Sequence, residues 1–125
     1  MNVIDSSGWL EYFINGGNSA FFAPVIENID EVFVPTINLF EVFKRVLIEK
    51  NRNDAVEAVA IMKGGHVIDL DDNLALVAAE LSCELKLPLA DSIILATARA
   101  HTATLWTQDA HFKGLEGVKY IEKKG

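Results

Sequence analysis

Short apolar runs that end at a polar residue alternate with longer segments of helical periodicity along this chain. The runs predict buried strands at residues 2–5, 31–34 and 104–107, with weaker candidates at 66–69 and 117–121. Apolar residues recur at i, i+3, i+4 and i+7 in two segments, and this spacing predicts amphipathic helices. These two stripes consist of Leu39, Val42, Phe43, Val46 and Leu47, and of Leu74, Val77, Ala78, Leu81 and Leu85. Thr36 and either Asp71 or Asp72 are predicted as helix N-caps.

Strands that alternate with helices indicate a parallel sheet with helices on both faces. No repeat, low-complexity segment or linker interrupts the pattern. Residues 1–125 are therefore predicted to form one α/β domain.

Composition and charge narrow the choice of protein class. Half of the residues are apolar, enough for one hydrophobic core, and the single cysteine, Cys83, cannot form an internal disulfide. No apolar run approaches the roughly 18 residues of a membrane helix, and the first residues do not form a secretory signal, so we expect a cytoplasmic domain without a membrane partner. Eleven basic and 18 acidic residues give a net charge of −7, whereas domains that bind chiefly through phosphate contacts are usually basic.

Polar residues follow two of the predicted strands. Asp5, Ser6 and Ser7 come directly after the first strand, and Thr107, Gln108 and Asp109 end or follow the strand at 104–107. Ligands of parallel sheets bind beyond the carboxyl ends of the strands. Both groups are therefore expected at the same edge of the sheet.

Two further acids lie in predicted helices. Asp91 shares a helix face with Ile94, Leu95 and Ala98, where an isolated ionised carboxylate is costly unless it is paired or binds a metal. The alternative is that Asp91 only caps its helix. Glu41 has Arg45 four residues later, so a solvated ion pair on the helix surface is its alternative.

Four carboxylates that meet in one pocket would repel one another and raise some of their pKa values. A divalent cation removes this penalty, and oxygen ligands suit Mg²⁺ or Mn²⁺. One or two such ions can activate water for phosphodiester hydrolysis. Asp5, Glu41, Asp91 and Asp109 are the candidate ligands.

The ordered set of these motifs resembles PIN-domain nucleases, especially VapC-type toxins, over essentially the whole chain. The motifs are Asp5-Ser6-Ser7, Glu41, Asp91 within Ala-Asp-Ser-Ile-Ile-Leu-Ala-Thr-Ala, and Asp109 within Thr-Gln-Asp-Ala-His-Phe. The resemblance implies a three-layer α/β/α sandwich and a metal-dependent endoribonuclease. Asp5, Glu41, Asp91 and Asp109 would form its metal site, and Ser7 and Thr107 would support it. Many relatives have an acid where this chain has His111, so a second metal is expected to bind weakly or only together with substrate.

The resemblance also implies the toxin of a type II toxin–antitoxin pair, a homodimer that an antitoxin protein inhibits. Two alternatives remain: an inactive PIN-like module that binds a partner protein, and a structure-specific DNA nuclease. The locally positive stretch at residues 44–52 is the candidate for phosphate contact.

Aromatic and histidine residues are not assigned to the site. Phe21, Phe22, Phe33, Phe40 and Phe43 are predicted to pack in the core. His66, His101 and His111 are scattered and are interpreted as surface or packing residues rather than zinc ligands.

Overall fold

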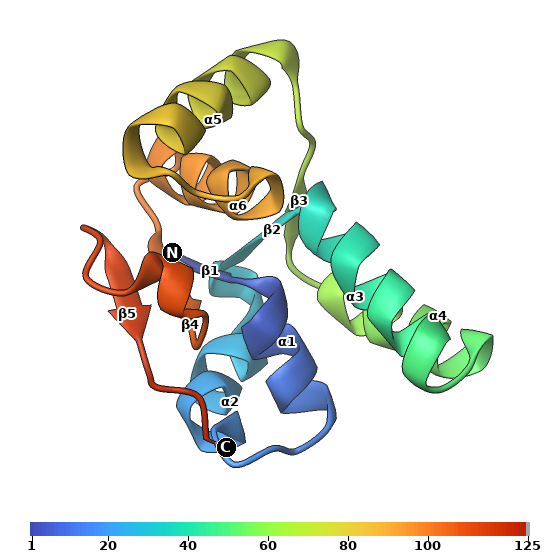
Figure 1. The fold of residues 1–125 in the computed structure, drawn as a ribbon. Coiled ribbons are helices and arrows are strands. Elements are labelled where there is room, and N and C mark those ends of the chain that lie inside the picture. The colour runs from blue at the N-terminus through green and yellow to red at the C-terminus, as the bar shows by residue number, and fades with distance from the viewer. Residues whose placement is uncertain (125) are drawn as a thin grey trace.

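The computed structural model describes residues 1–124 and shows a parallel sheet surrounded by helices (Figure 1). The strands are β1 (Asn2–Ile4), β2 (Val32–Pro35), β3 (His66–Ile68), β4 (Thr104–Thr107) and β5 (Val118–Tyr120). The helices are α1 (Ser6–Phe13), α2 (Ser19–Glu27), α3 (Thr36–Glu49), α4 (Arg52–Met62), α5 (Asp72–Leu85) and α6 (Leu89–Ala100). Two 3₁₀ turns, η1 (Ile29–Glu31) and η2 (Ala110–Phe112), complete the elements.

All strand pairs are parallel, and the strand order is β3-β2-β1-β4-β5. The strands β2 and β3 therefore lie on one side of β1, and β4 and β5 lie on its other side. The order reverses between β1 and β4, which is where open α/β sheets bind ligands. The five predicted strands and the α/β class are confirmed.

Helices cover both faces of the sheet because successive strand residues point to opposite sides. Val3 of β1 belongs to a cluster with Leu95 of α6, whereas Ile4 belongs to a second cluster with Trp9 of α1 and Phe22 of α2. Helices α5 and α6 thus form one outer layer, and α1 and α2 form the other (Figure 1). This arrangement is the predicted α/β/α sandwich.

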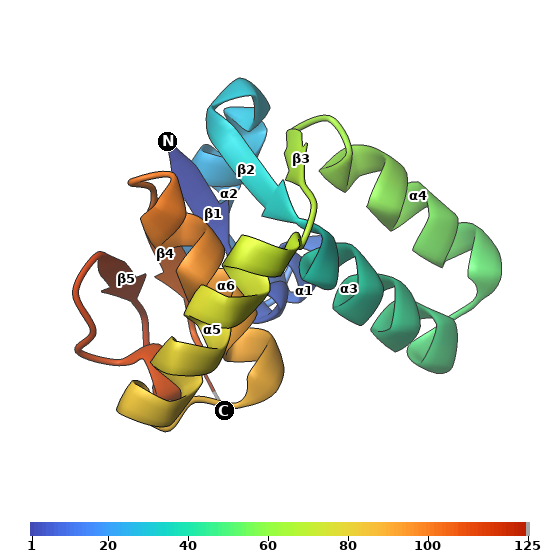
Figure 2. The same cartoon turned by 90° about the horizontal axis from the view of Figure 1, so that it is seen from above.

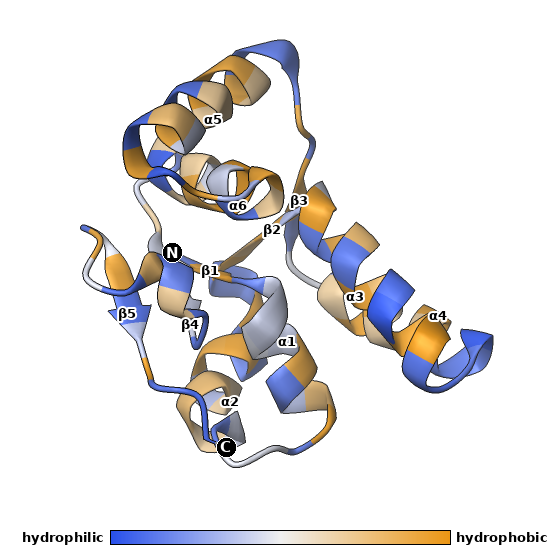
Figure 3. Cartoon of the chain, viewed as in Figure 1, coloured by the Kyte–Doolittle hydropathy of each residue, from blue (hydrophilic) through white to orange (hydrophobic). Residues whose placement is uncertain are grey.

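The strand β2 has apolar residues at three consecutive positions and is coloured accordingly in Figure 3, as expected for a strand buried on both faces. Figures 1 and 2 both show that α3 and α4 form a hairpin that extends away from the sheet. Its inner side joins the cluster on the α1 face through Val42, Ala58 and Met62.

Two details of the sequence prediction are wrong. Thr36 is not an N-cap, because Pro35 holds that position and α3 follows β2 without a loop; Asp71 does cap α5, accepting the Leu74 N–H at 2.8 Å. Phe40 does not pack in the core. Its relative exposure is 61%, because Phe40 lies on a side of α3 that no other element covers, whereas Phe22 is fully buried.

None of the helices within residues 1–124 has both the length and the apolar character that crossing a bilayer requires.

Candidate active site

Asp5 lies at the end of β1, where the chain passes directly into α1. Its backbone N–H donates to the Trp106 carbonyl of β4 at 3.1 Å, so the two central strands hold this position. The carboxylate accepts the Ser7 hydroxyl at 2.8 Å and the Gly8 N–H at 3.3 Å, and it is therefore the N-cap of α1. Asp5 is only 3% exposed.

Burial makes Asp5 an unusually weak acid for an aspartate. Loss of water raises its pKa from 3.8 to about 7, and the charge of Asp109 contributes to this rise. Hydrogen bonds from Ser7, Gly8 and Thr107 act in the opposite direction. The Thr107 hydroxyl also accepts the backbone N–H of Asp109 at 2.8 Å, so Thr107 links the Asp5 carboxylate to the backbone of Asp109.

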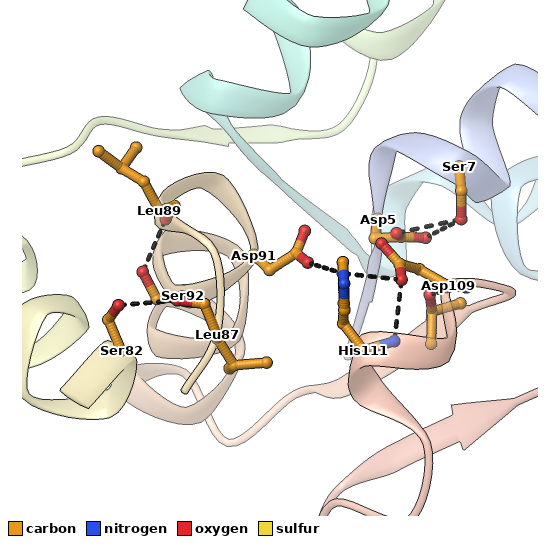
Figure 4. A network of polar contacts seen from close by, with 10 residues as sticks. Asp5, Ser7, Ser82, Leu87, Leu89, Asp91, Ser92, Asp109 and His111 are labelled. Atoms are coloured by element: carbon orange, nitrogen blue, oxygen red, sulfur yellow. Dashed lines mark hydrogen bonds and ion pairs between the residues drawn. The ribbon is translucent and has the colours of Figure 1, made fainter. Parts of the chain in front are cut away.

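Asp91 is the third residue of α6 and is 9% exposed. The N-cap position belongs to Pro88, so the alternative that Asp91 only caps the helix is wrong. Its carboxylate meets His111 Nδ1 at 2.9 Å (Figure 4). Burial, followed by the charges of Asp109 and Glu41, raises the pKa of Asp91 to about 6, against the lowering effect of His111.

Glu41 reaches the site from α3. It accepts the Ser6 hydroxyl at 2.7 Å, and the predicted alternative pair with Arg45 does not form, because Arg45 pairs with Glu49 at 3.1 Å. Asn38, one turn before Glu41, is fully buried; its amide donates to the Ile4 carbonyl at 2.8 Å and its oxygen lies 3.0 Å from the Ser6 hydroxyl. These bonds fix α3 against the end of β1.

Ser6 and Asn38 are site residues that the sequence pattern does not predict. A signal for Asn38 was available, because a polar residue three positions before Glu41 lies on the same helix face. Ser6 was noted only as a hydroxyl residue after the first strand.

Asp109 follows β4 and begins η2. Its Oδ1 accepts the backbone N–H of His111 at 2.9 Å and lies 3.1 Å from His111 Nδ1. The charge of Asp109, followed by the hydrogen bond with Asp91, raises the pKa of His111. The interpretation of His111 as a surface residue outside the site was therefore incomplete: its side chain is 58% exposed, yet it bridges two of the predicted acids.

The four predicted acids line one open cleft of about 630 Å³, together with Ser6 and Ser7. Phe40, Lys44, Arg45 and Lys123 also border this cleft. Within residues 1–124, no lysine or arginine forms an ion pair with any of the four acids. Buried carboxylates such as Asp5 and Asp91, which have no lysine or arginine partner, fit a site for a divalent cation.

The ligand atoms of Asp91, Asp109 and His111 lie within 4.8 Å of one another and could hold an ion together. Asp5 and Glu41 lie outside this group, although they line the same cleft. Both nevertheless interact electrostatically with this group, because the charge of Asp109 raises the pKa of Asp5 and the charge of Glu41 raises the pKa of Asp91. The structure thus brings the predicted residues to one cleft, with Asp91 and Asp109 closest to a ligand arrangement.

Comparisons with known proteins agree with this fold. A toxin–antitoxin complex from Klebsiella pneumoniae contains a similar chain, with a TM-score of 0.76, 25% identity and coverage of 95% of this chain and 96% of that chain. VapBC2 from Rickettsia felis, bound to a DNA fragment from its promoter, gives a TM-score of 0.74 at 17% identity and covers 97% of both chains.

VapC20 from Mycobacterium tuberculosis, described as a sarcin–ricin loop cleaving toxin, gives a TM-score of 0.70 at 16% identity, with coverage of 83% and 85%. Among curated proteins, none matches this sequence. The family model described as PIN domain matches residues 3–118. The resemblance noted in the sequence is thereby confirmed, and the chain belongs to the PIN domain family.

Proposed function

We propose that this protein is a metal-dependent endoribonuclease and the toxin of a type II toxin–antitoxin pair. One observation carries the proposal. Acids from four separate parts of the chain line a single cleft at the strand-order reversal, and no lysine or arginine within residues 1–124 pairs with them. His111 meets two of these acids, and a divalent cation would offset the negative charge that remains.

Asp5, Glu41, Asp91 and Asp109 are the residues that hold the ion, Mg²⁺ or Mn²⁺. When bound, the ion supplies a nucleophile at neutral pH and stabilises charge on the phosphodiester. Ser7 and the Thr107 hydroxyl orient the carboxylate of Asp5 by hydrogen bonds.

The rim of the cleft supports an unpaired RNA strand as substrate. The exposed ring of Phe40 offers a surface on which a base can stack, and the Lys44 ammonium lies 5.8 Å from the ring centre. Lys44, Arg45 and Lys123 supply positive charge next to the acids, within a chain of net charge −7. The similar VapC20 structure, described as cleaving the sarcin–ricin loop, also supports RNA.

An antitoxin protein is the proposed partner, because several structures with this fold are described as toxin–antitoxin assemblies. A homodimer and a cytoplasmic location belong to the same proposal. Light scattering of the purified chain, and copurification with the product of a neighbouring reading frame, test the homodimer and the partner.

Cleavage of total cellular RNA with and without Mg²⁺ or Mn²⁺ tests the catalytic proposal. We expect cleavage with either ion, none in EDTA, and none from a folded Asp91→Asn variant. Glu80→Gln is the matched control, because Glu80 is an exposed carboxylate of α5 away from the cleft. Cleavage that persists in EDTA would contradict the metal mechanism.

The same assay separates the alternatives. A folded chain that cuts neither RNA nor DNA, and gains no thermal stability with Mn²⁺, would be a binding module. Cleavage of branched or flapped DNA in preference to RNA would indicate a structure-specific DNA nuclease.

A further inference from the structure

His111 contacts two of the acids that line the cleft, and its imidazole differs in chemistry from their carboxylates. Its backbone N–H donates to Asp109 Oδ1 at 2.9 Å, which fixes the start of η2. The ring is thereby held with Nδ1 between two acids, 2.9 Å from Asp91 Oδ2 and 3.1 Å from Asp109 Oδ1 (Figure 4).

These separations suit a shared ion as well as a shared proton. In an octahedral site with bonds of about 2.1 Å, neighbouring ligand atoms lie roughly 3.0 Å apart. The two measured separations, 2.9 and 3.1 Å, lie on either side of that value. An ion can therefore replace the Nδ1 proton, which passes to solvent, without a large movement of the ring.

The exposure of the ring leaves room for the remaining ligands. The His111 side chain is 58% exposed, whereas those of Asp91 and Asp109 are 13% and 29% exposed. The three ligand atoms lie within 4.8 Å of one another, and Asp91 and Asp109 line the open cleft, which leaves room there for water and a substrate phosphate.

A nitrogen ligand changes which ion a site prefers. Mg²⁺ is bound almost entirely through oxygen, whereas neutral imidazole suits first-row transition ions. A site with one imidazole and two or more carboxylates therefore favours a transition ion over Mg²⁺, relative to the same site with oxygen ligands alone.

We propose that His111 Nδ1 is a ligand of the ion bound by Asp91 and Asp109, and that it gives this site a preference for Mn²⁺ over Mg²⁺. The inference rests on the proposed function, because it assumes that the acids bind a divalent cation. His111 then determines which divalent ion the site binds more tightly.

Metal binding by the intact chain, measured without RNA, tests this inference. Free Mn²⁺ is counted by electron paramagnetic resonance during titration, and Mg²⁺ is added as the competitor. Pulsed spectra of bound Mn²⁺ report whether a nitrogen nucleus lies in its coordination shell. The variants are His111→Ala, which removes the ligand, and His111→Asp, which replaces nitrogen with oxygen.

His66→Asn is the matched control, because His66 is an exposed histidine of β3 bonded to the Asp30 carbonyl and distant from the cleft. We expect nitrogen coupling in the wild type and in His66→Asn, and none in either His111 variant. His111→Ala should weaken Mn²⁺ binding by at least about 10-fold, because loss of a residue that only orients a metal ligand already costs that much. His111→Asp should bind Mg²⁺ at least as well as the wild type while losing Mn²⁺ affinity.

Two results would overturn the inference in distinguishable ways. Bound Mn²⁺ without nitrogen coupling, and with the same Mn²⁺/Mg²⁺ ratio in His111→Asp, would remove His111 from the coordination shell and leave the nuclease proposal intact. Failure of the folded wild-type chain to bind either ion would contradict the proposed metal-dependent function as well.

Discussion

Replacing Asp5 by asparagine should stabilise the metal-free protein while abolishing its activity. Asp5 is 3% exposed, and burial raises its pKa from 3.8 to about 7. A shift of about 3 pKa units corresponds to roughly 4 kcal/mol of unfavourable free energy for the ionised carboxylate in the folded chain at pH 8. Asparagine carries no charge and is as good an N-cap as aspartate.

The amide does not reproduce every contact of the carboxylate. One oxygen is replaced by an NH₂ group, so a hydroxyl that now donates to Asp5, from Ser7 or Thr107, loses its acceptor. Such a loss costs on the order of 1 kcal/mol. The net expectation for Asp5→Asn is a gain of about 2 to 3 kcal/mol in the free energy of unfolding at pH 8.

This gain should depend on pH in a defined direction. Between pH 4 and 7 the folded state keeps the Asp5 proton that the unfolded chain has released, so the wild type becomes more stable as the pH falls. The Asp5→Asn variant lacks this contribution. The gain of Asp5→Asn over the wild type should therefore be largest at pH 8 and shrink through pH 7 to 5. Near pH 4 only the lost hydrogen bond remains, and the variant should be about 1 kcal/mol less stable than the wild type.

Urea unfolding at pH 8, 6 and 4.5, in EDTA, measures the effect. Asp71→Asn is the matched control, because Asp71 caps α5 through the Leu74 N–H at an exposed position where no charge is buried. Its effect on the free energy of unfolding should be small at pH 8, where Asp5→Asn gives its largest gain. If Asp5→Asn instead lost the same stability at all three pH values, burial of the Asp5 charge would not destabilise the fold, and Asp5 would act only as a helix cap.

Three further outcomes are expected. Phe40→Ala should raise the KM for single-stranded RNA several-fold with little change in kcat, whereas Leu89→Ala, at an exposed apolar residue outside the cleft, should not. An equal loss of RNA affinity in both variants would contradict base stacking on Phe40. Asn38→Ala should lower the free energy of unfolding by about 1 to 3 kcal/mol, measured in urea, because the buried Ile4 carbonyl loses its donor. Gly8→Ala should cost at least 1 to 3 kcal/mol in the same assay, roughly the cost of overpacking, because an added Cβ would lie 2.6 Å from the Ile4 side chain and 2.7 Å from the Phe22 ring.

Much of the architecture was present in local patterns. Apolar runs that ended in polar residues gave the strands, since a strand buried on both faces needs neither side to be polar. Parallel connections then placed Asp5 and Asp109 at one edge of the sheet, because carboxyl ends of parallel strands meet there. The burial of Asp91 followed from helical periodicity, as its neighbours on that face are apolar.

Other features depended on how distant elements pack. The apolar stripe of α3 could be predicted from its spacing, but the exposure of Phe40 could not. Phe40 is exposed because α4 packs on the other side of α3. Glu41 had Arg45 at a suitable spacing, yet it bonds Ser6, because α3 begins at the end of β2, beside β1.

The sequence by itself determined the strands, the class of fold and the acids that could act together, because these depend on periodicity and chain order. Only the tertiary structure decided that His111 meets Asp91, twenty residues away, and that the acids lack a lysine or arginine partner within residues 1–124. Such pairings depend on the distances between side chains of separate elements. These distances are set by the packing of α3 and α6 on the sheet, which no local pattern encodes.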